Sequence, residues 1–279
     1  MPADLHCHTK ISDGSVSIEE LLQLAKRKGL KTVAVTDHDT FAGAIRAKVY
    51  GKRNEIEVIP GAEFSTADTE TGKRAHILCY FCSNTDRLEG LCKHTSDARR
   101  RASLVMLQKV IHLYPVTAEM IMRRAQGSTN IYKQHVMHAL IDAGCTDEFY
   151  GPVYRKLFDR KVGLAYSAIH YPDTRDVIKQ IHDAGGVTVF AHPCLYDGFP
   201  LLEKLASEGL LDGVEVNHPC NKEDDEEKAR AIAQKYHLAM TGGSDFHGMY
   251  TNHRTEVGAC LTEDDQIELL KKRAAALRK

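Results

Sequence analysis

A series of histidines and carboxylates, each beside an apolar run, constrains this chain more than any other feature. The series opens with Asp4-Leu5-His6-Cys7-His8 and ends with Asp245-Phe246-His247. In an extended segment alternate residues face the same side, so His6 and His8 can hold one cation together. A lone His-x-His motif is weak evidence, whereas a series at the edges of expected strands predicts a multinuclear metal site. Between its two ends the series runs through Asp13, Asp37, His38, Asp39, Glu63, His76 and His192.

Apolar runs of β-type composition alternate with helix-like segments along most of the chain. Most of these runs are continuous Val, Ile and Ala stretches, which is typical of parallel strands buried on both faces. Ser17-Ile18-Glu19-Glu20 is a capping box that opens a helix ending at Gly29. The repeated βα units predict an α/β fold related to the eight-stranded (β/α) barrel. The expected strands are 3–8, 32–36, 57–60, 76–82, 187–191, 213–216 and 239–242, and later helices are expected at 173–184, 222–236 and 262–279.

The stretch 86–168 breaks this alternation, because it contains only helical periods, at 98–112, 118–124 and 132–143. It carries 13 basic and 8 acidic residues, a net charge of +5, so the rest of the chain carries −6. We therefore expect a discontinuous barrel domain, 1–85 and 169–279, and a helical insert, 86–168. A basic insert over an acidic metal cup would suit a lid for an anionic substrate; the alternative is an ordinary solvated helical elaboration.

The overall composition excludes several classes. The formal net charge is −1, so nothing global points to nucleic acid or a membrane. No apolar run approaches the roughly 20 residues that span a bilayer. Met1-Pro2-Ala3 leads directly into an expected strand and leaves no room for a signal peptide, and the eight scattered cysteines favour reduced thiols. These features predict a cytoplasmic protein.

The motifs together resemble those of the polymerase and histidinol phosphatase (PHP) superfamily. The resemblance covers about 1–85 and 169–260, and it implies a distorted (β/α)7 barrel with a trinuclear metal site at the C-terminal ends of the strands. The position of the insert, and the pattern Lys133-x-His135, resemble the branch that contains nucleotide phosphatases and 5′–3′ small-RNA exonucleases. The motifs are Asp-x-His-x-His, Ser12-Asp13-Gly14, Thr36-Asp37-His38-Asp39, Pro60-Gly61-Ala62-Glu63, Ala191-His192-Pro193 and Gly243-Ser244-Asp245-Phe246-His247.

The resemblance implies three divalent or trivalent metal ions, of manganese, iron or zinc. Some members of the superfamily have a histidine where this chain has Asp13, and the harder oxygen ligand favours manganese or iron over an all-nitrogen zinc site. The implied ligand sets are His6, His8, Glu63 and Asp245; Glu63, His76 and His192; and Asp13, His38 and His247.

This arrangement suits hydrolysis of phosphate esters. Two cations that share a carboxylate lie roughly 3.5–4 Å apart and lower the pKa of a water so that hydroxide can attack phosphorus. The third cation and nearby basic groups would neutralise the phosphoryl oxygens. The residues assigned to the catalytic centre are Asp37, Asp39, Glu63 and His247. Asp4 and Asp37 would orient ligand histidines, and Asp39 could instead reach the metal or the substrate.

The expected substrate contacts are Arg99, Lys133, His135 and Asn217. Arg99 begins a run of three arginines near the start of an insert helix, which could face the cup or be a solvated face. Asn217 or His218, after strand 213–216, could face the substrate, or either could be a loop residue.

The sequence therefore predicts a metal-dependent phosphoesterase. Its expected substrates are AMP, a 3′,5′-nucleoside bisphosphate or the 5′ end of short RNA, with phosphate as a product and no duplex DNA as a partner. One alternative is a histidinol-phosphate phosphatase. Another is an amidohydrolase barrel, although those that are binuclear usually need a bridging lysine where this chain has Glu63. The last is a metal-binding module without catalysis.

Overall fold

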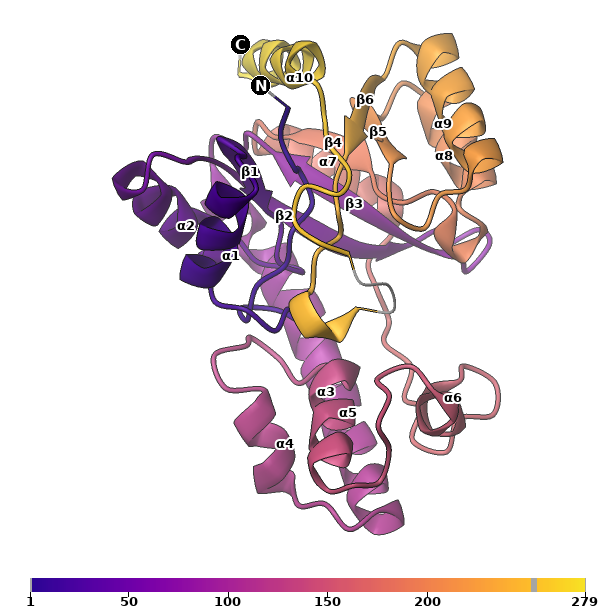
Figure 1. Ribbon diagram of the computed structural model, residues 1–279. Helices are drawn as coiled ribbons and strands as arrows, with labels where there is room; N and C mark the ends of the chain where they lie inside the picture. The colour runs from indigo at the N-terminus through magenta and orange to yellow at the C-terminus, as the bar shows by residue number, and fades with distance from the viewer. Residues whose placement is uncertain (1, 252–254, 279) are drawn as a thin grey trace.

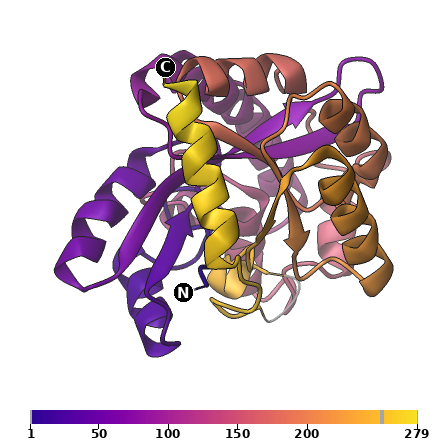
Figure 2. The ribbon, with the colours of Figure 1, turned by 90° about the horizontal axis from the view of Figure 1, so that it is seen from above.

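The computed structural model describes residues 2–251 and 255–278, and a curled six-stranded sheet lies at the centre of this part of the chain. Figure 2 looks onto one end of the curl, which forms a half-barrel with helices around its outside. In chain order and in sheet order the strands are β1 (Thr32–Val35), β2 (Glu57–Ala67), β3 (Arg74–Tyr80), β4 (Val187–Phe190), β5 (Gly213–Asn217) and β6 (Ala239–Gly242).

The expectation of an all-parallel sheet was wrong for β3. This strand runs antiparallel to both β2 and β4, while the other neighbouring strands pair in parallel. The cause is the short connection between β2 and β3, a tight turn in which Asp68 accepts hydrogen bonds from Thr71. Such a turn can join only antiparallel strands, because a parallel pair needs a crossover of a dozen or more residues. As a result, the start of β3 lies beside the C-terminal ends of β2 and β4.

The expected first strand, 3–8, forms only isolated bridges, so the sheet of the described residues is a six-stranded half-barrel. Its residues Ala3, Asp4 and Cys7 bridge separate parts of the chain. The segment nevertheless lies between β1 and the chain that follows β6. Its backbone hydrogen bonds are Ala34 N to Asp4 O, Thr36 N to Cys7 O, Leu5 N to Gly242 O and His8 N to Phe246 O.

In the described part of the chain six helices pack against the sheet, and those expected there from the sequence are confirmed. Ser17 and Glu20 cap the first helix reciprocally, as the capping box predicted. The last helix lies across one end of the curl (Figure 2), where its Ile267 and Leu270 pack against Val187 of β4. Burial of each such side chain contributes about 1.5–3 kcal/mol. The six are α1 (Ile18–Arg27), α2 (Ala42–Arg53), α7 (Thr174–Asp183), α8 (Phe199–Ser207), α9 (Glu223–Tyr236) and α10 (Asp264–Leu277).

Four further helices lie together at the opposite end of the molecule from α10 (Figure 1). They are α3 (Glu89–Leu113), α4 (Ala118–Arg124), α5 (Lys133–Asp142) and α6 (Pro152–Phe158). They enclose an apolar cluster of their own, which includes Val110, Ile121, Val136, Leu140 and Leu157. Short 3₁₀ turns complete the fold at η1 (Thr85–Leu88), η2 (Leu195–Asp197) and η3 (Gly248–Tyr250).

Among the described residues, no helix has the length and apolar character needed to cross a membrane.

Candidate metal centre and active site

The nine predicted metal ligands converge at the end of the curled sheet that faces α3 and α5. They come from the N-terminal segment, from the loops after β1, β4 and β6, and from β2 and β3. Glu63 lies inside β2, which continues past the expected end at Pro60 as far as Ala67. His76 lies near the start of β3, and the antiparallel direction of that strand carries it to the same edge as the others.

Glu63 occupies the centre of the group. Its Oε1 lies 2.7 Å from His76 Nδ1 and 3.0 Å from His192 Nε2. Its Oε2 faces a second set of ring nitrogens, at 3.3 Å for His6, 3.2 Å for His8 and 3.2 Å for His38. One carboxylate thus serves two groups of imidazoles, as a bridging ligand must.

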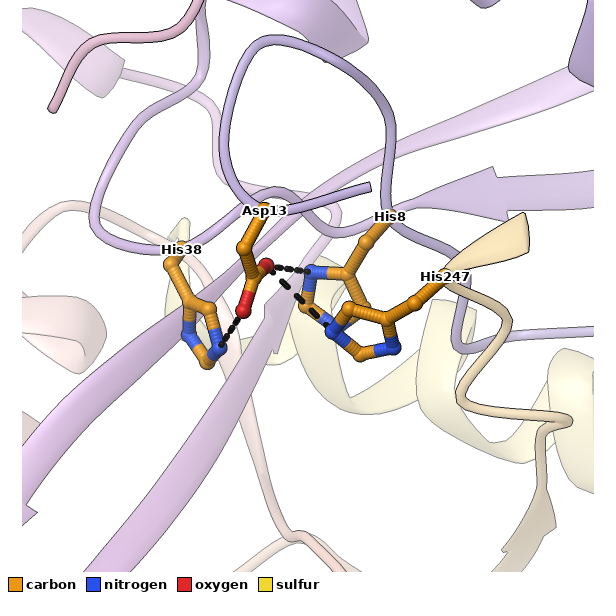
Figure 3. A group of neighbouring side chains, drawn as sticks. All are labelled: His8, Asp13, His38 and His247. Atoms are coloured by element: carbon orange, nitrogen blue, oxygen red, sulfur yellow. Dashed lines mark ion pairs between the residues drawn. The ribbon is translucent and has the colours of Figure 1, made fainter. Parts of the chain in front are cut away.

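A second group surrounds Asp13 (Figure 3). Its Oδ1 lies 3.3 Å from His247 Nε2 and 3.7 Å from His8 Nδ1, and its Oδ2 lies 3.8 Å from His38 Nε2. Gln134 of α5 donates to Asp13 Oδ2 at 3.1 Å. The helical part of the molecule therefore contacts this group directly.

The nine predicted ligands line a hollow that we call the cup. Three of the loops that carry cup residues have strained backbone. Asp39, His192 and Asp245 follow β1, β4 and β6, and they have φ angles of 55°, 29° and 48°. Non-glycine residues in this left-handed region cost of order 1–3 kcal/mol each, and such strain concentrates at functional sites. At Asp245 the strained turn places Oδ1 3.3 Å from His8 Nε2 and 3.5 Å from His6 Nε2.

The buried charges balance one another. Burial raises the pKa of Glu63, but the imidazoles of His38, His76 and His6 outweigh it and hold that pKa well below its usual value. Burial lowers the pKa of His6, but Glu215 and Glu63 raise it well above its usual value. The carboxylates thus stay ionised and attract positive charge to the rings. A metal cation would replace ring protons there, because an imidazole ligand must be neutral.

The nitrogen and oxygen atoms of the cup are suitable ligands for metal ions. Asp13 Oδ1 and His38 Nδ1 are buried without a hydrogen-bond partner, and the Nε2 atoms of His6 and His8 approach to 3.1 Å. Bound cations would satisfy such atoms, since imidazole and carboxylate are common ligands of zinc, iron and manganese. Four groups have ligand atoms within 4.8 Å of one another: His8, Asp13, His38 and His247; His6, His8 and Glu63; His38, Glu63 and His76; and His6, Glu215 and His218.

Hydrogen bonds on the far side of two rings orient them toward the cup. His6 Nδ1 donates to Glu215 Oε1 at 3.1 Å, and His247 Nδ1 donates to the carbonyl oxygen of Asp245 at 2.8 Å. In both rings the proton then lies on Nδ1, and the Nε2 lone pair faces the cup. Glu215 also accepts from the backbone N–H of His192 at 2.8 Å.

The aspartates Asp4, Asp37 and Asp39 hold loops. Asp37 accepts hydrogen bonds from Thr9 N, Thr9 Oγ1 and Ser12 Oγ, at 2.7–2.8 Å. Asp39 accepts from Ser65 N at 2.9 Å and from Arg99 Nη2 at 2.7 Å. Asp4 likewise accepts from the backbone N–H and hydroxyl groups of Ser244. Each carboxylate thereby fixes a segment that carries predicted ligands.

Two adjoining cavities open at the cup. The first, of about 330 Å³, lies over the metal-binding groups and is lined by Glu63, Asp245, His247 and His218. The second, of about 170 Å³, is bounded by α3 and α5. It is lined by three cations, Arg74, Arg99 and Lys133, and by the tyrosines Tyr132, Tyr166 and Tyr171. Both cavities share His38, His76, Gln134, Tyr154 and Tyr196.

The structure separates the four predicted substrate contacts. Arg99 and Lys133 line the second cavity. His135 is buried elsewhere, where its Nδ1 accepts from Tyr132 N at 3.1 Å and caps α5. Asn217 turns toward the chain after β6 and donates to Leu261 O at 3.1 Å.

Two residues of this region were absent from the sequence-based predictions. Glu215 stands in the apolar strand Gly213–Asn217, and a carboxylate in a buried strand is itself a signal, because it requires a polar partner. Arg74 opens β3 and lies over the ring of Tyr171, 5.2 Å from its centroid. No local sequence signal indicates its position, because the neighbours of Arg74 come from the distant segment around Tyr171.

Buried histidines and carboxylates gathered at the end of a curled α/β sheet are typical of metal-dependent hydrolases. The PHP domain family matches residues 4–188, and the chain belongs to that family. It is therefore a hydrolase that acts on phosphoester bonds.

Relatives of known activity span nearly the whole chain. The phosphoribosyl 1,2-cyclic phosphate 1,2-diphosphodiesterase of Eggerthella lenta is 36% identical over 90% of this chain and 95% of the relative. The 5′–3′ exoribonuclease Rnm of Escherichia coli is 30% identical over 88% and 84%. The 3′,5′-nucleoside bisphosphate phosphatase of Chromobacterium violaceum is 28% identical over 88% and 86%. A solved Bifidobacterium adolescentis protein assigned as a metal-dependent phosphoesterase superposes with a TM-score of 0.88 at 28% identity, over 97% of this chain and 96% of that one.

Proposed function

We propose that this protein hydrolyses a phosphoester of a small, nucleotide-like substrate that carries a second phosphate, such as a 3′,5′-nucleoside bisphosphate. The observation that supports this proposal is the cationic cavity beside the cup. Arg99 and Arg74 both lie over Tyr171, at 5.8 and 5.2 Å from its centroid. Lys133 Nζ lies 5.8 Å from the centroid of Tyr166, whose hydroxyl interacts with Arg74 Nη2 at 3.4 Å.

The charge of this cavity is only partly neutralised. Arg99 is paired with Asp39 at 2.7 Å. Within the described ranges, no carboxylate lies within 4.0 Å of Lys133 or Arg74. Unpaired cations in a partly buried cavity attract an anion, and phosphate is a preferred partner of Arg and Lys. The names of two relatives, which act on a phosphoribosyl cyclic phosphate and on a nucleoside bisphosphate, also denote substrates with two phosphates.

In this proposal the cup holds three metal ions, of manganese, iron or zinc. Their ligands would be His6, His8, Glu63 and Asp245; Glu63, His76 and His192; and Asp13, His38 and His247. Bound there, the ions would supply an activated water near neutral pH and neutralise phosphoryl charge.

The chain's own residues would prepare this chemistry. Glu63 would join two of the ligand groups, and His247 would be held by its hydrogen bond to the Asp245 carbonyl. Asp37 and Asp39 would act by holding the loops that carry Asp13 and His38. The second cavity would bind the remote phosphate and so orient the ester over the cup.

We also propose an architecture for the chain and a location for the protein in the cell. Segment 3–8 would complete a distorted (β/α)7 barrel made of 1–85 and 169–279. The part 86–168 would be a helical insert that serves as a substrate lid. The protein would act in the cytoplasm, without duplex DNA or a membrane as partner.

The test compares kcat/KM for a 3′,5′-nucleoside bisphosphate, AMP, phosphoribosyl 1,2-cyclic phosphate and histidinol phosphate, with Mn²⁺ present. We expect a substrate with two phosphates to be preferred, and Lys133→Met to reduce that preference by raising KM. Lys161→Met, at an exposed lysine, is the matched control and should leave it unchanged. Equal kcat/KM for AMP and the bisphosphate, or an unaffected preference in Lys133→Met, would contradict the proposal.

A second candidate is removal of nucleotides from the 5′ end of short RNA. The relative from Escherichia coli named as a 5′–3′ exoribonuclease and the net charge of +5 over 86–168 favour it. A 5′-phosphorylated short RNA in the same panel decides between the two, because higher kcat/KM on RNA than on any mononucleotide selects the exonuclease. Preference for histidinol phosphate would select that phosphatase instead. Metal binding without turnover of any substrate would support a non-catalytic module.

A further inference from the structure

His218 follows β5 and lies in the wall of the cavity over the cup. Only 2% of the residue is exposed. Its ring centroid lies 5.3 Å from that of His192 and 6.1 Å from that of His6. By position alone it resembles the predicted ligands around it.

The hydrogen bonds of its ring distinguish His218 from those neighbours. Its Nδ1 accepts from the backbone N–H of Cys220 at 3.1 Å. An accepting Nδ1 carries no hydrogen, so the hydrogen of the neutral ring lies on Nε2. His6 and His247 show the opposite pattern, because their Nδ1 atoms donate to Glu215 and to the Asp245 carbonyl. The Nε2 of His218 therefore carries N–H, whereas the Nε2 atoms of His6 and His247 carry a lone pair.

The Nε2–H group of His218 is buried and has no hydrogen-bond partner. The neighbouring carboxylate oxygen, Asp245 Oδ2, lies 3.5 Å away. Asp245 directs its other oxygen toward His6 and His8. A buried donor without a partner in the wall of a cavity is a rare arrangement that indicates an absent acceptor.

We propose that His218 is a phosphate-binding donor rather than a metal ligand, and that its Nε2–H contacts an oxygen of the substrate phosphoryl group above the cup. This inference rests on the proposed function, in which a phosphoester occupies the first cavity. A phosphoryl oxygen is a strong acceptor, and a preorganised donor stabilises the charge that accumulates there during hydrolysis. The hydrogen bond from Cys220 disfavours a metal ion at Nε2, because a neutral ligand ring would have to carry its hydrogen on Nδ1 and would lose that bond.

Two substitutions distinguish the N–H group that His218 presents to the cavity from the hydrogen bond that it accepts from Cys220 N. In His218→Asn the amide oxygen can still accept from Cys220 N, but the side chain is too short to donate into the cavity. In His218→Gln the longer side chain can carry an N–H to the position of Nε2. His170→Ala, at an exposed histidine outside the cup, is the control, and melting curves establish that each variant is folded.

The experiment measures metal ions per chain by elemental analysis, then kcat and KM with Mn²⁺, and binding of inorganic phosphate to the metal-loaded protein by calorimetry. We expect His218→Asn to keep the wild-type metal content, to lose on the order of 10²-fold in kcat/KM, and to bind phosphate more weakly. His218→Gln should recover part of both losses. Loss of a metal ion in His218→Asn would make His218 a ligand and overturn the inference, as would unchanged kinetics and phosphate binding.

The outcomes also separate this inference from the proposed function. If the wild type hydrolyses no substrate of the panel, the proposed function fails, and phosphate binding by the two variants still tests the donor. If the wild type is active and His218→Asn is equally active, the inference about His218 fails alone.

Discussion

Glu215→Gln is the substitution that most directly tests how the cup is held together. The carboxylate of Glu215 is fully buried, accepts from His6 Nδ1 at 3.1 Å, and accepts from His192 N at 2.8 Å. Glutamine has nearly the same size, but its amide offers one oxygen and an NH₂ group. It can therefore satisfy only one of the two donors well, and it removes the negative charge that favours His6 as a ligand.

The expected magnitude follows from these contacts. Loss of a charge-assisted hydrogen bond costs roughly 1.5–3 kcal/mol, and partners that orient metal ligands are typically worth about 10–100-fold in metal affinity or activity. We therefore expect Glu215→Gln to release Mn²⁺ to a chelator at 10–100-fold lower chelator concentration, with kcat/KM lowered in the same range.

The assay is a chelator titration of the Mn²⁺-loaded protein, read by elemental analysis, with initial rates measured in parallel. Glu227→Gln changes the same functional group at an exposed position of α9 and should behave as wild type. The reasoning would be refuted if Glu215→Gln kept wild-type metal affinity and activity, because the orientation of His6 would then not depend on this carboxylate.

Three further substitutions or conditions test separate parts of the account. Asp245→Asn should lower turnover by at least roughly 10²-fold while melting like the wild type, since it removes a proposed ligand; wild-type rates would contradict the ligand set. Burial and the charges of nearby arginines lower the pKa of Lys133 to about 8, so the lysine is charged below that pH and neutral above it. The KM ratio of bisphosphate to AMP should therefore rise as the pH increases through about 8, and it should not do so in Lys133→Met. Arg99→Met should destabilise the protein by about 3–5 kcal/mol in denaturant unfolding, because it leaves Asp39 buried and unpaired; a loss below about 1 kcal/mol, typical of exposed pairs, would refute this.

Most of the candidate ligands could be predicted because they follow the expected strands directly in the sequence. Each parallel strand ends at the same edge, so residues after β1, β4 and β6 must meet there. His76 did not fit that rule from the sequence alone, because it stands near the start of its strand. The hairpin between β2 and β3 explains its position. Asp68 and Gly72 are turn residues, but the expected strand end at Pro60 placed the turn too early to indicate a hairpin.

Other features could not be predicted in this way, because they depend on contacts between segments that are distant in the sequence. Segment 3–8 has the composition of a strand, but it bonds only intermittently to β1 and to the chain after β6. His135 was expected at the substrate because Lys133-x-His135 resembles the pattern of one branch of the superfamily, yet its ring caps α5. Glu215 could have been recognised as a charged residue in a buried strand, whereas the tautomer of His218 follows only from the hydrogen bond with Cys220.

The central claim is that phosphoester hydrolysis depends on metal ions held in the cup. The most direct measurement is phosphate release from a 3′,5′-nucleoside bisphosphate by protein stripped with a chelator, before and after addition of Mn²⁺. The account predicts no release from the stripped protein and full recovery with the metal. Undiminished release from metal-free protein would contradict it, as would a failure of Mn²⁺, Fe²⁺ and Zn²⁺ to produce any release.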